Sequence, residues 1–418
     1  MKRLVVYLNN EQVGALDVND SGLLEFRYAP EWTSRPDAVP LSRSLPLQSD
    51  AFRGKHVKPF FAGLLPDEGP RRQVARILGI SESNDFAMLE RIGGECAGAV
   101  SLLPEDTPPP TAGPMQVREF SESELENIIA ELPRRPLMAG SEGLRLSLAG
   151  AQPKLPVLIR DGAAVALPLG STPSTHIIKP EPAQFPGLTA IEALCMTLAS
   201  AAGLNVPAVT VRPVGNTPCL VVQRYDRIHN ADGTVTRVHQ EDFCQALGFP
   251  PDRKYQQEGG PLLRDCIGLL RTWSTAPARD VVDFLDGLIF NVLIGNADAH
   301  GKNYSMLYRD GERRLAPFYD LVCTRAWSEL DTMPAMKIGG CDSIDTITPE
   351  HWQNMAKETN IGWPGLRERI DHLCTKTLAS LRSGIVLRAA SHDEAMAQRV
   401  TAIIEEQASR LLRSLLGG

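Results

Sequence analysis

A proline-rich stretch interrupts the chain between residues 104 and 114 and limits how it can fold. Prolines stand at positions 104, 108, 109, 110 and 114, with a glycine at 113. Proline fixes the backbone angle φ and lacks an N–H donor, so this stretch cannot lie inside a helix or a sheet. Because 418 residues exceed the size of one ordinary domain, we predict a first domain over residues 1–105 and a linker over residues 106–120.

The first domain has the pattern of a small α/β unit. Apolar runs at residues 4–8 and 13–18 flank Asn9–Asn10, which is typical of a β-hairpin. Residues 23–28 are expected to add a third strand. Helices are expected over residues 60–65 and 71–78.

The second region, residues 121–239, mixes strands with a helix. Two apolar runs, 155–160 and 163–169, flank Asp161–Gly162, a dipeptide typical of two-residue hairpin turns. A short strand ends at Lys179, and the helix after it carries apolar residues at i, i+3, i+4 and i+7, namely Ile191, Leu194, Cys195 and Leu198. Two further strands are expected over residues 208–213 and 219–222.

The remaining residues, 240–418, are expected to be mostly helical, with apolar stripes such as Val281, Leu285, Leu288 and Val292. A hairpin, a strand ending in lysine, a helix, two strands and then a helical half is the order of elements in a protein kinase. We therefore predict an α+β, two-lobed protein-kinase-like fold with an extra N-terminal α/β subdomain. Residues 121–239 would form the N-lobe with its phosphate loop and ATP lysine. Residues 240–418 would form the helical C-terminal lobe with the catalytic loop.

The segment Gly295–Asn303 carries the strongest chemical signal. Asp298 precedes Asn303 by five residues, which is the D-x-x-x-x-N spacing of a kinase catalytic loop. In that loop the carboxylate accepts the proton of the substrate hydroxyl, and the asparagine reaches a magnesium ion. The alternative is a polar turn after a helix, in which Asn296 and Asp298 only cap backbone groups. The spacing alone leaves both possibilities open.

Asp320 is a second potential metal ligand. It follows a strand expected over residues 304–308 and a turn at Asp310–Gly311, where a kinase places its magnesium-binding aspartate. The aromatic residues Phe318 and Tyr319 precede this aspartate, whereas in the D-F-G motif the aromatic residue follows.

Lys179 and Glu192 stand where a kinase has its phosphate-binding lysine and the helical glutamate that steadies it. Either residue alone is typical of a solvated charge. Found in the kinase order with Asp298, Asn303 and Asp320, the pair favours a kinase over a polar turn.

The chain lacks the glycine-rich loop G-x-G-x-x-G of protein kinases. The matching place holds Ser147–Lys154, with the sequence SLAGAQPK. Its small residues would let backbone N–H groups approach phosphates, and Lys154 would add positive charge.

Four motifs resemble those of the HipA toxin kinases. They are Ser147–Lys154, His176–Lys179 (HIIK), Leu293–Asn303 (LIGNADAHGKN) and Pro317–Asp320 (PFYD). The N-terminal hairpin and the segments Tyr28–Trp32, Ser44–Leu47 and Leu64–Asp67 also resemble that family's N-terminal region. The resemblance covers nearly the whole chain, and the motifs are specific as a set.

The resemblance implies roles for individual residues. Asp298 would be the catalytic base, Asn303 and Asp320 the magnesium ligands, Glu192 a supporting residue, and Ser147 the site of autophosphorylation. The implied ATP-binding residues are Ala149, Gly150, Ala151, Gln152, Pro153, Lys154, Lys179, Gln223, Arg224, Tyr225, His300, Gly301, Lys302, Asn303, Tyr319 and Asp320. Residues 149–154 would cover the phosphates. Residues 223–225 would form the hinge against adenine, with Gln223 in place of an expected acidic residue.

The resemblance also implies a serine/threonine-protein kinase that acts as the toxin of a type II toxin–antitoxin pair. It would use ATP and Mg²⁺ to phosphorylate a cellular protein and itself. The expected partners are a small helix-turn-helix antitoxin, operator DNA mainly through that antitoxin, and an aminoacyl-tRNA synthetase as substrate.

Composition adds limits to these expectations. The net charge of −7 argues against a protein whose whole surface binds nucleic acid. No apolar run reaches the length of a membrane span, and the eight cysteines show no C-x-x-C spacing. We expect a cytoplasmic protein whose thiols behave as small apolar groups.

Three alternatives to a toxin kinase remain. A small-molecule or lipid kinase could share the catalytic spacing, although no acidic pocket sequence or basic membrane helix is evident. A non-catalytic scaffold for antitoxin and DNA would not need all five kinase-type polar residues. A metal hydrolase using Asp298 and His300 would need further ligands at comparable spacing, and the eight histidines are scattered.

Overall fold

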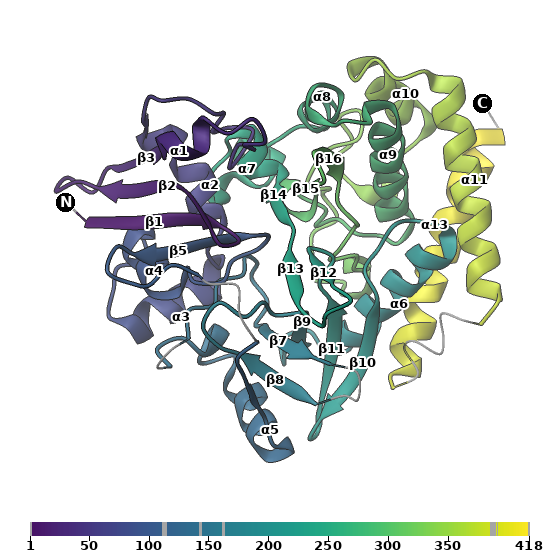
Figure 1. The fold of residues 1–418 in the computed structure, drawn as a ribbon. Coiled ribbons are helices and arrows are strands. Elements are labelled where there is room, and N and C mark those ends of the chain that lie inside the picture. Colours follow the sequence, from purple (N-terminus) through teal and green to yellow (C-terminus); the bar gives the residue numbers. More distant parts are fainter. Residues whose placement is uncertain are drawn as a thin grey trace. The chain divides into compact units, whose positions relative to one another are not determined.

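The computed structural model describes residues 2–110, 115–141, 144–160, 164–384, 390 and 392–416. The chain forms two compact units. Unit 1 comprises Met1–Pro182, Pro213–Pro251 and Met306–Glu312, and unit 2 comprises Ala183–Arg212, Asp252–Ser305 and Arg313–Gly418. Helices and sheets are combined in an α+β fold, as predicted (Figure 1). The division of the chain at residues 105, 120 and 239 stays a prediction.

The N-terminal part of unit 1 is built on a five-stranded sheet with the order β4-β3-β2-β1-β5. Its strands are β1 (Lys2–Leu8), β2 (Glu11–Val18), β3 (Leu24–Tyr28), β4 (Phe52–Arg53) and β5 (Val100–Pro104). The predicted hairpin is confirmed, since β1 and β2 pair antiparallel. Asn9 in its turn has a φ of +54°, a left-handed conformation that asparagine tolerates. Side chains alternate along the strands, so Leu4 and Val6 enter a buried core with Phe26 and Phe60.

Short helices accompany this sheet. They are α1 (Pro30–Thr33), η1 (Gly54–His56, a 3₁₀ helix), α2 (Lys58–Gly63), α3 (Glu68–Leu78) and α4 (Asp85–Ile92). The helices expected over residues 60–65 and 71–78 correspond to α2 and α3. The helix α3 ends at Gly79, whose φ of +65° suits glycine at a helix C-terminus.

The second sheet has the strand order β10-β11-β9-β7-β8-β6. Its strands are β6 (Val117–Glu119), β7 (Leu155–Ile159), β8 (Val165–Pro168), β9 (His176–Pro180), β10 (Val209–Val214) and β11 (Thr217–Gln223). The strands β7 and β8 pair antiparallel as expected, while the turn predicted between them at Asp161–Gly162 lies outside the described residues. The helix α5 (Glu122–Glu131) begins with a capping box between Ser121 and Glu124, and η2 (Pro136–Met138) follows it.

Further short elements complete the strand-rich part of the chain. They are β12 (Arg227–His229), β13 (Val235–Arg237), β14 (His239–Asp242), α7 (Phe243–Leu247), η3 (Pro251–Arg253), β15 (Ser305–Arg309) and β16 (Glu312–Leu315). The strands β12 and β13 form a two-stranded sheet, and a three-stranded sheet has the order β14-β15-β16.

Unit 2 is mainly helical. Its helices are α6 (Leu188–Ala202), α8 (Leu263–Trp273), α9 (Pro277–Leu293), α10 (Pro349–Glu358), α11 (Trp363–Arg382) and α13 (Glu394–Leu416). Its 3₁₀ helices are η4 (Gln256–Glu258), η5 (Gly301–Asn303), η6 (Thr324–Ala326) and η7 (Ile344–Thr346). The helix α11 packs against α6, α9 and α13. The stripe predicted from Val281 to Val292 is confirmed, because all four of its side chains are buried in α9.

Two general expectations can be compared with the structure. Within the described ranges, no helix combines the length and the apolar character that a membrane span requires. All eight cysteines are described, and each is a buried free thiol. They therefore pack as small apolar side chains, as predicted.

Candidate active site

The helix α9 and the turn after it fix the start of the loop that contains Asp298. Gly295 has a φ of +68°, and a Cβ there would lie 2.8 Å from Cγ of Arg325, so both conformation and space require glycine. Asn296 is buried, and its Nδ2 donates to Oδ1 of Asn291 in α9 over 2.8 Å. Its Oδ1 accepts from the N–H of Asp298 over 3.0 Å. Asn296 thus stabilises the backbone of the loop, as the polar-turn alternative predicted.

Asp298 behaves differently from Asn296. Its residue is exposed, and its Oδ1 accepts a hydrogen bond from the hydroxyl of Tyr255 over 2.8 Å. Its backbone carbonyl accepts from the N–H of His300 over 2.9 Å and from Nδ2 of Asn303 over 3.0 Å. The loop therefore holds the backbone of Asp298 while presenting its carboxylate at the surface of unit 2.

The bond between Asn303 and Asp298 also orients the amide of Asn303. A carbonyl oxygen can only accept, so the amide nitrogen must face Asp298 and the amide oxygen Oδ1 must point away from it. The amide oxygen of Asn303 is therefore the atom that could bind a metal ion. Hard oxygen donors of this kind, an amide and a carboxylate, suit Mg²⁺. Asn303 and Asp320 thus fit the ion in donor chemistry.

Tyr319 connects the segment of Asp320 to the same loop. Its hydroxyl donates to the carbonyl oxygen of Lys302 over 2.7 Å and lies 2.8 Å from Oγ of Ser305. Lys302 directly precedes Asn303, and Tyr319 directly precedes Asp320. The bond between Tyr319 and Lys302 therefore joins the segments of the two predicted metal ligands.

Asp320 has an unusual backbone. Its φ is +52°, in the left-handed region that non-glycine residues seldom adopt. Aspartate tolerates this region better than most residues. Strained backbone of this type is often retained at functional sites, which makes Asp320 a candidate on grounds independent of motif spacing.

A glycine in α9 supports the segment before Asp320. The ring of Phe318 lies so close to Gly287 that a Cβ there would be 2.4 Å from Cε1 of the ring. The N–H of Phe318 donates to the carbonyl of Asn205 over 2.8 Å. Close packing against the helix thus fixes the direction in which the chain enters Tyr319 and Asp320.

The phosphate-covering loop predicted at residues 147–154 lies in unit 1. Ser147 is fully buried, its N–H donates to the carbonyl of Glu95 over 2.8 Å, and its hydroxyl donates to the carbonyl of Leu64 over 2.7 Å. Nζ of Lys154 donates to the carbonyl of Ala149 over 2.7 Å, which closes the loop. Gly150 between them has a φ of +105°, and a Cβ there would lie 2.5 Å from that Nζ.

Two further bonds anchor the loop to neighbouring elements. The N–H of Asp67 donates to the carbonyl of Gly150 over 3.3 Å, and Nε2 of Gln152 donates to the carbonyl of Pro180 over 3.4 Å. Pro180 ends β9, the strand that carries the buried Lys179. The structure thus brings the predicted loop and the predicted ATP lysine onto adjoining parts of unit 1. Glu192, also buried, belongs to α6 in unit 2, so its pairing with Lys179 stays a prediction.

Two side chains of the predicted hinge, residues 223–225, make hydrogen bonds within the protein. Arg224 is buried, its guanidinium binds Asp226 over 2.7–2.9 Å, and its N–H donates to the carbonyl of Thr175 over 2.9 Å. The hydroxyl of Tyr225 donates to Gln240. The side chain of Arg224 therefore serves a protein-internal network, and an adenine contact of this segment stays a prediction for its other atoms.

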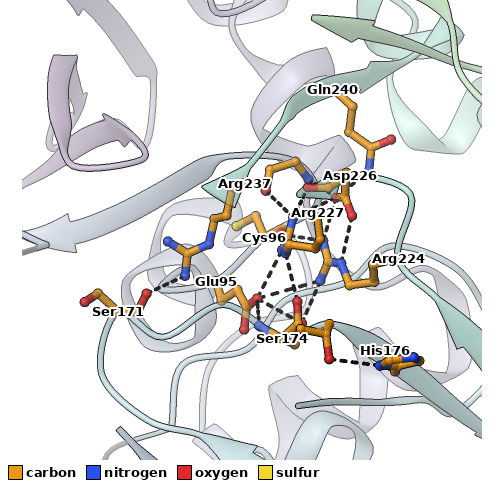
Figure 2. A network of polar contacts seen from close by, with 12 residues as sticks. Glu95, Cys96, Ser171, Ser174, His176, Arg224, Asp226, Arg227, Arg237 and Gln240 are labelled. Atoms are coloured by element: carbon orange, nitrogen blue, oxygen red, sulfur yellow. Dashed lines mark hydrogen bonds and ion pairs between the residues drawn. The ribbon is translucent and has the colours of Figure 1, made fainter. Parts of the chain in front are cut away.

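That network is a cluster of buried charges that sequence analysis missed (Figure 2). Oε1 of Glu95 accepts from the N–H of Ser174 over 2.7 Å and from Nη2 of Arg227 over 3.1 Å. Burial raises the pKa of Asp226, but Arg224 and Arg227 outweigh that effect and hold it well below its ordinary value. The strand β13 contributes a further arginine, Arg237, whose Nη2 donates to the carbonyl of Ser171 over 3.0 Å. The run Arg224–Arg227, with three charges in four residues, was the signal that could have revealed part of it.

Sequence analysis also missed Tyr255. This residue lies in the short segment between η3 and η4. Elsewhere in the described ranges, no group of three or more His, Cys, Asp or Glu side chains is arranged to hold a metal ion. A kinase-type magnesium site does not need one, because nucleotide phosphates supply the other ligands.

Comparison with known proteins assigns both halves of the chain to family models. The model "HipA N-terminal domain" matches residues 4–103, and the model "HipA-like C-terminal domain" matches residues 146–382. A putative kinase of Sinorhizobium fredii, Y4mE, is 48% identical over 377 residues, which cover 90% of each chain. The serine/threonine-protein kinase toxin HipA of Shewanella oneidensis is 31% identical over 374 residues, which cover 86% of this chain and 84% of the relative.

Among solved structures, the chain resembles Shewanella oneidensis HipA in a complex with HipB and its operator DNA. The TM-score is 0.86 at 26% identity, and the match covers 99% of this chain and 98% of the other. The predicted kinase-like fold with its additional N-terminal subdomain is thereby confirmed.

Proposed function

The chain belongs to the HipA family of serine/threonine-protein kinases, and from this premise we propose that it transfers the γ-phosphoryl group of ATP to a serine of another protein. The observation that carries this proposal is the arrangement around Asp298 in unit 2. Asp298 presents an exposed carboxylate, and Nδ2 of Asn303 donates to its carbonyl. The segment of Asp320, whose φ is +52°, is joined to the same loop by the bond from Tyr319 to Lys302.

Each residue has a role in the proposed transfer. Asp298 accepts the proton of the serine hydroxyl while the hydroxyl oxygen forms a bond to the γ-phosphorus. The bond between that phosphorus and the β–γ bridging oxygen breaks, and ADP leaves with the electron pair. Magnesium, when bound by Asn303 and Asp320, would neutralise phosphate charge. Lys179 and the backbone of residues 149–154 would bind the phosphates.

The role of toxin follows from the relatives. The protein 31% identical to this chain is named a kinase toxin, and the similar solved structure contains HipA with HipB and operator DNA. We infer that this chain binds a small helix-turn-helix antitoxin and reaches operator DNA mainly through it, consistent with a net charge of −7. An aminoacyl-tRNA synthetase is the proposed substrate.

Ser147 is the proposed site of autophosphorylation. Its hydroxyl is buried and donates to Leu64, so a phosphate of about −1.5 to −2 charges could not remain where the hydroxyl lies. Phosphorylation would therefore require residues 147–154 to leave their place and would prevent their return. This supports a kinase that switches itself off.

The proposal is tested by phosphoryl transfer from radiolabelled ATP and by growth arrest on expression without antitoxin. Asp298→Asn should lose transfer by about 10²–10⁴-fold, retain nucleotide binding and cause no arrest. Asp310→Asn is the matched control, because Asp310 is an exposed aspartate in the β15–β16 turn. It should behave as the wild type. Arrest by both the wild type and Asp298→Asn would favour a non-catalytic scaffold and would overturn the proposal.

A further inference from the structure

The hydroxyl of Tyr255 donates to one oxygen of the Asp298 carboxylate, Oδ1, over 2.8 Å. Tyr255 lies 43 residues before Asp298, and no kinase motif in the sequence includes it. Both residues belong to unit 2.

Tyr255 is held in place from several sides. Its carbonyl accepts from the N–H of Gly260 over 2.9 Å, and a Cβ on Gly260 would lie 2.7 Å from that carbonyl oxygen. The next residue, Gln256, is bound at its N–H by the carbonyl of Ala335 over 3.0 Å and at its side chain by the N–H of Lys337 over 2.7 Å. The segment that carries the phenol is therefore fixed before any substrate arrives.

The ring of Tyr255 also contacts the catalytic loop. It meets the ring of His300 edge to face, with centroids 5.1 Å apart, and Nζ of Lys254 lies 5.2 Å from its centroid. The N–H of Gly301 donates to the carbonyl of Lys254 over 3.4 Å. Residues 254–256 thus pack against the loop 298–301. Their backbone is fixed by hydrogen bonds, and the phenol of Tyr255 points at Asp298.

The carboxylate of an exposed aspartate can adopt several side-chain conformations, and only some of them suit proton transfer. A fixed donor on one oxygen selects a single orientation. Resting on the proposed function, we propose that Tyr255 is a positioning residue for phosphoryl transfer. Its phenol holds Oδ1 of Asp298, so that the second oxygen, Oδ2, is the one that receives the proton of the substrate hydroxyl. Tyr255 itself neither gains nor loses a proton in the step.

The chain offers a second phenol–carboxylate pair as a matched control. The hydroxyl of Tyr308 donates to Glu241 in unit 1, where both residues are buried. Tyr308→Phe removes the same type of bond from a pair to which we assign no part in catalysis. Tyr255→Phe keeps the ring contacts to His300 and Lys254 and removes only the hydroxyl.

The test is single-turnover and steady-state phosphoryl transfer by the full chain from ATP with magnesium, followed as phosphate incorporated into the protein itself. Tyr255→Phe should lower the rate constant at saturating ATP about tenfold, the effect of one hydrogen bond to a charged group. The KM for ATP and the midpoint of thermal unfolding should stay unchanged. Tyr308→Phe should leave the rate constant unchanged, whatever it does to stability.

A double-mutant cycle with Asp298→Asn separates positioning from a general structural role. If Tyr255 acts through Asp298, its replacement has no further effect in the Asp298→Asn background. A Tyr255→Phe variant with the wild-type rate, or one whose loss multiplies with that of Asp298→Asn, overturns the inference. No transfer by the wild type at all would instead contradict the proposed kinase activity, so the two failures are distinguishable.

Discussion

The hydroxyl of Tyr319 donates to the carbonyl oxygen of Lys302, and this 2.7 Å bond joins the segment of Asp320 to the loop of Asn303. The two proposed metal ligands lie 17 residues apart in sequence. The distance between them is therefore set by a side chain that would not itself touch the ion.

Tyr319→Phe should weaken magnesium-dependent nucleotide binding about tenfold, because it removes the bond that holds the two ligand segments together. Calorimetry with a non-hydrolysable ATP analogue, with and without magnesium, measures the effect. Ser305→Ala is the control, since it removes the other partner of the Tyr319 hydroxyl and keeps the bond to Lys302. An equal loss in both variants would contradict the specific role of Lys302.

Asp320 should respond differently to asparagine and to alanine. Asparagine tolerates a φ of +52°, whereas alanine there should cost about 1–2 kcal/mol of folding free energy. Both variants should lose the magnesium dependence of nucleotide binding, because both lack the carboxylate. Urea unfolding and the same calorimetry separate strain from ligation. A magnesium effect that survives in Asp320→Asn would exclude Asp320 as a ligand.

Ser147 should carry one phosphate after the wild-type protein is incubated with ATP and magnesium. The modified protein should bind nucleotide poorly, because a phosphorylated Ser147 can no longer lie buried against the carbonyl of Leu64, and residues 147–154 then cannot return to their place. Intact-mass measurement followed by a nucleotide titration gives the result. Ser147→Ala should keep nucleotide binding, and Asp298→Asn should stay unmodified. A phosphorylated protein with normal nucleotide affinity would refute the switch.

Glu241 should make folding stability depend on pH. Burial raises its pKa to about 7, although Ser42 and Tyr308 donate to it. A carboxyl with a raised folded pKa contributes most below its unfolded value of 4.5 and loses that contribution as pH rises through 7.

The measurement for Glu241 is the difference in unfolding free energy between the wild type and Glu241→Gln. From pH 5 to pH 8 the unfolding free energy of the wild type should fall by about 2–3 kcal/mol relative to that of Glu241→Gln. Titrating groups distant from Glu241 cancel in the comparison. The ring of His239 packs against Tyr308, and burial lowers the pKa of His239 to about 4, so its contribution to stability changes with pH in the opposite direction. A constant difference over this range would contradict a protonated Glu241.

Asp226→Asn should destabilise the protein by about 3–5 kcal/mol, because it removes one of the two buried carboxylates that balance Arg224 and Arg227 and leaves only Glu95. Denaturant unfolding measures the loss. Asp232→Asn is the matched control on the exposed β12–β13 turn and should leave the stability close to that of the wild type. Similar losses at both positions would show that the buried cluster has no special weight.

Local patterns in the sequence were sufficient for much of the fold. The hairpin at Asn9 and the apolar stripe of α9 depend on periodicities of two and 3.6 residues, which any short window contains. The spacing from Asp298 to Asn303 is local for the same reason. The structure adds that the amide of Asn303 bonds the carbonyl of Asp298, so the spacing corresponds to a closed turn.

Contacts between distant residues could not be predicted in this way. Tyr255 approaches Asp298 from 43 residues away, and Glu95 meets Arg227 from 132 residues away. Nothing in either local sequence indicates the partner. Arg224 is a related case, because its guanidinium binds Asp226, two residues later, within the protein. The hinge contact with the nucleotide stays a prediction for the other atoms of residues 223–225.

Glu95 connects the two regions of this chain that match separate family models. It lies in the region matched by the N-terminal family model, whereas Ser147, Ser174 and Arg227 lie in the region matched by the C-terminal one. Its backbone carbonyl binds the first residue of the proposed phosphate-covering loop, and its carboxylate is a counter-ion of the buried Arg227. A fragment trimmed to residues 146–382 would therefore lack the Glu95 carboxylate that pairs with Arg227. In this chain the region matched by the N-terminal model thus supplies part of the buried core of the region matched by the C-terminal model.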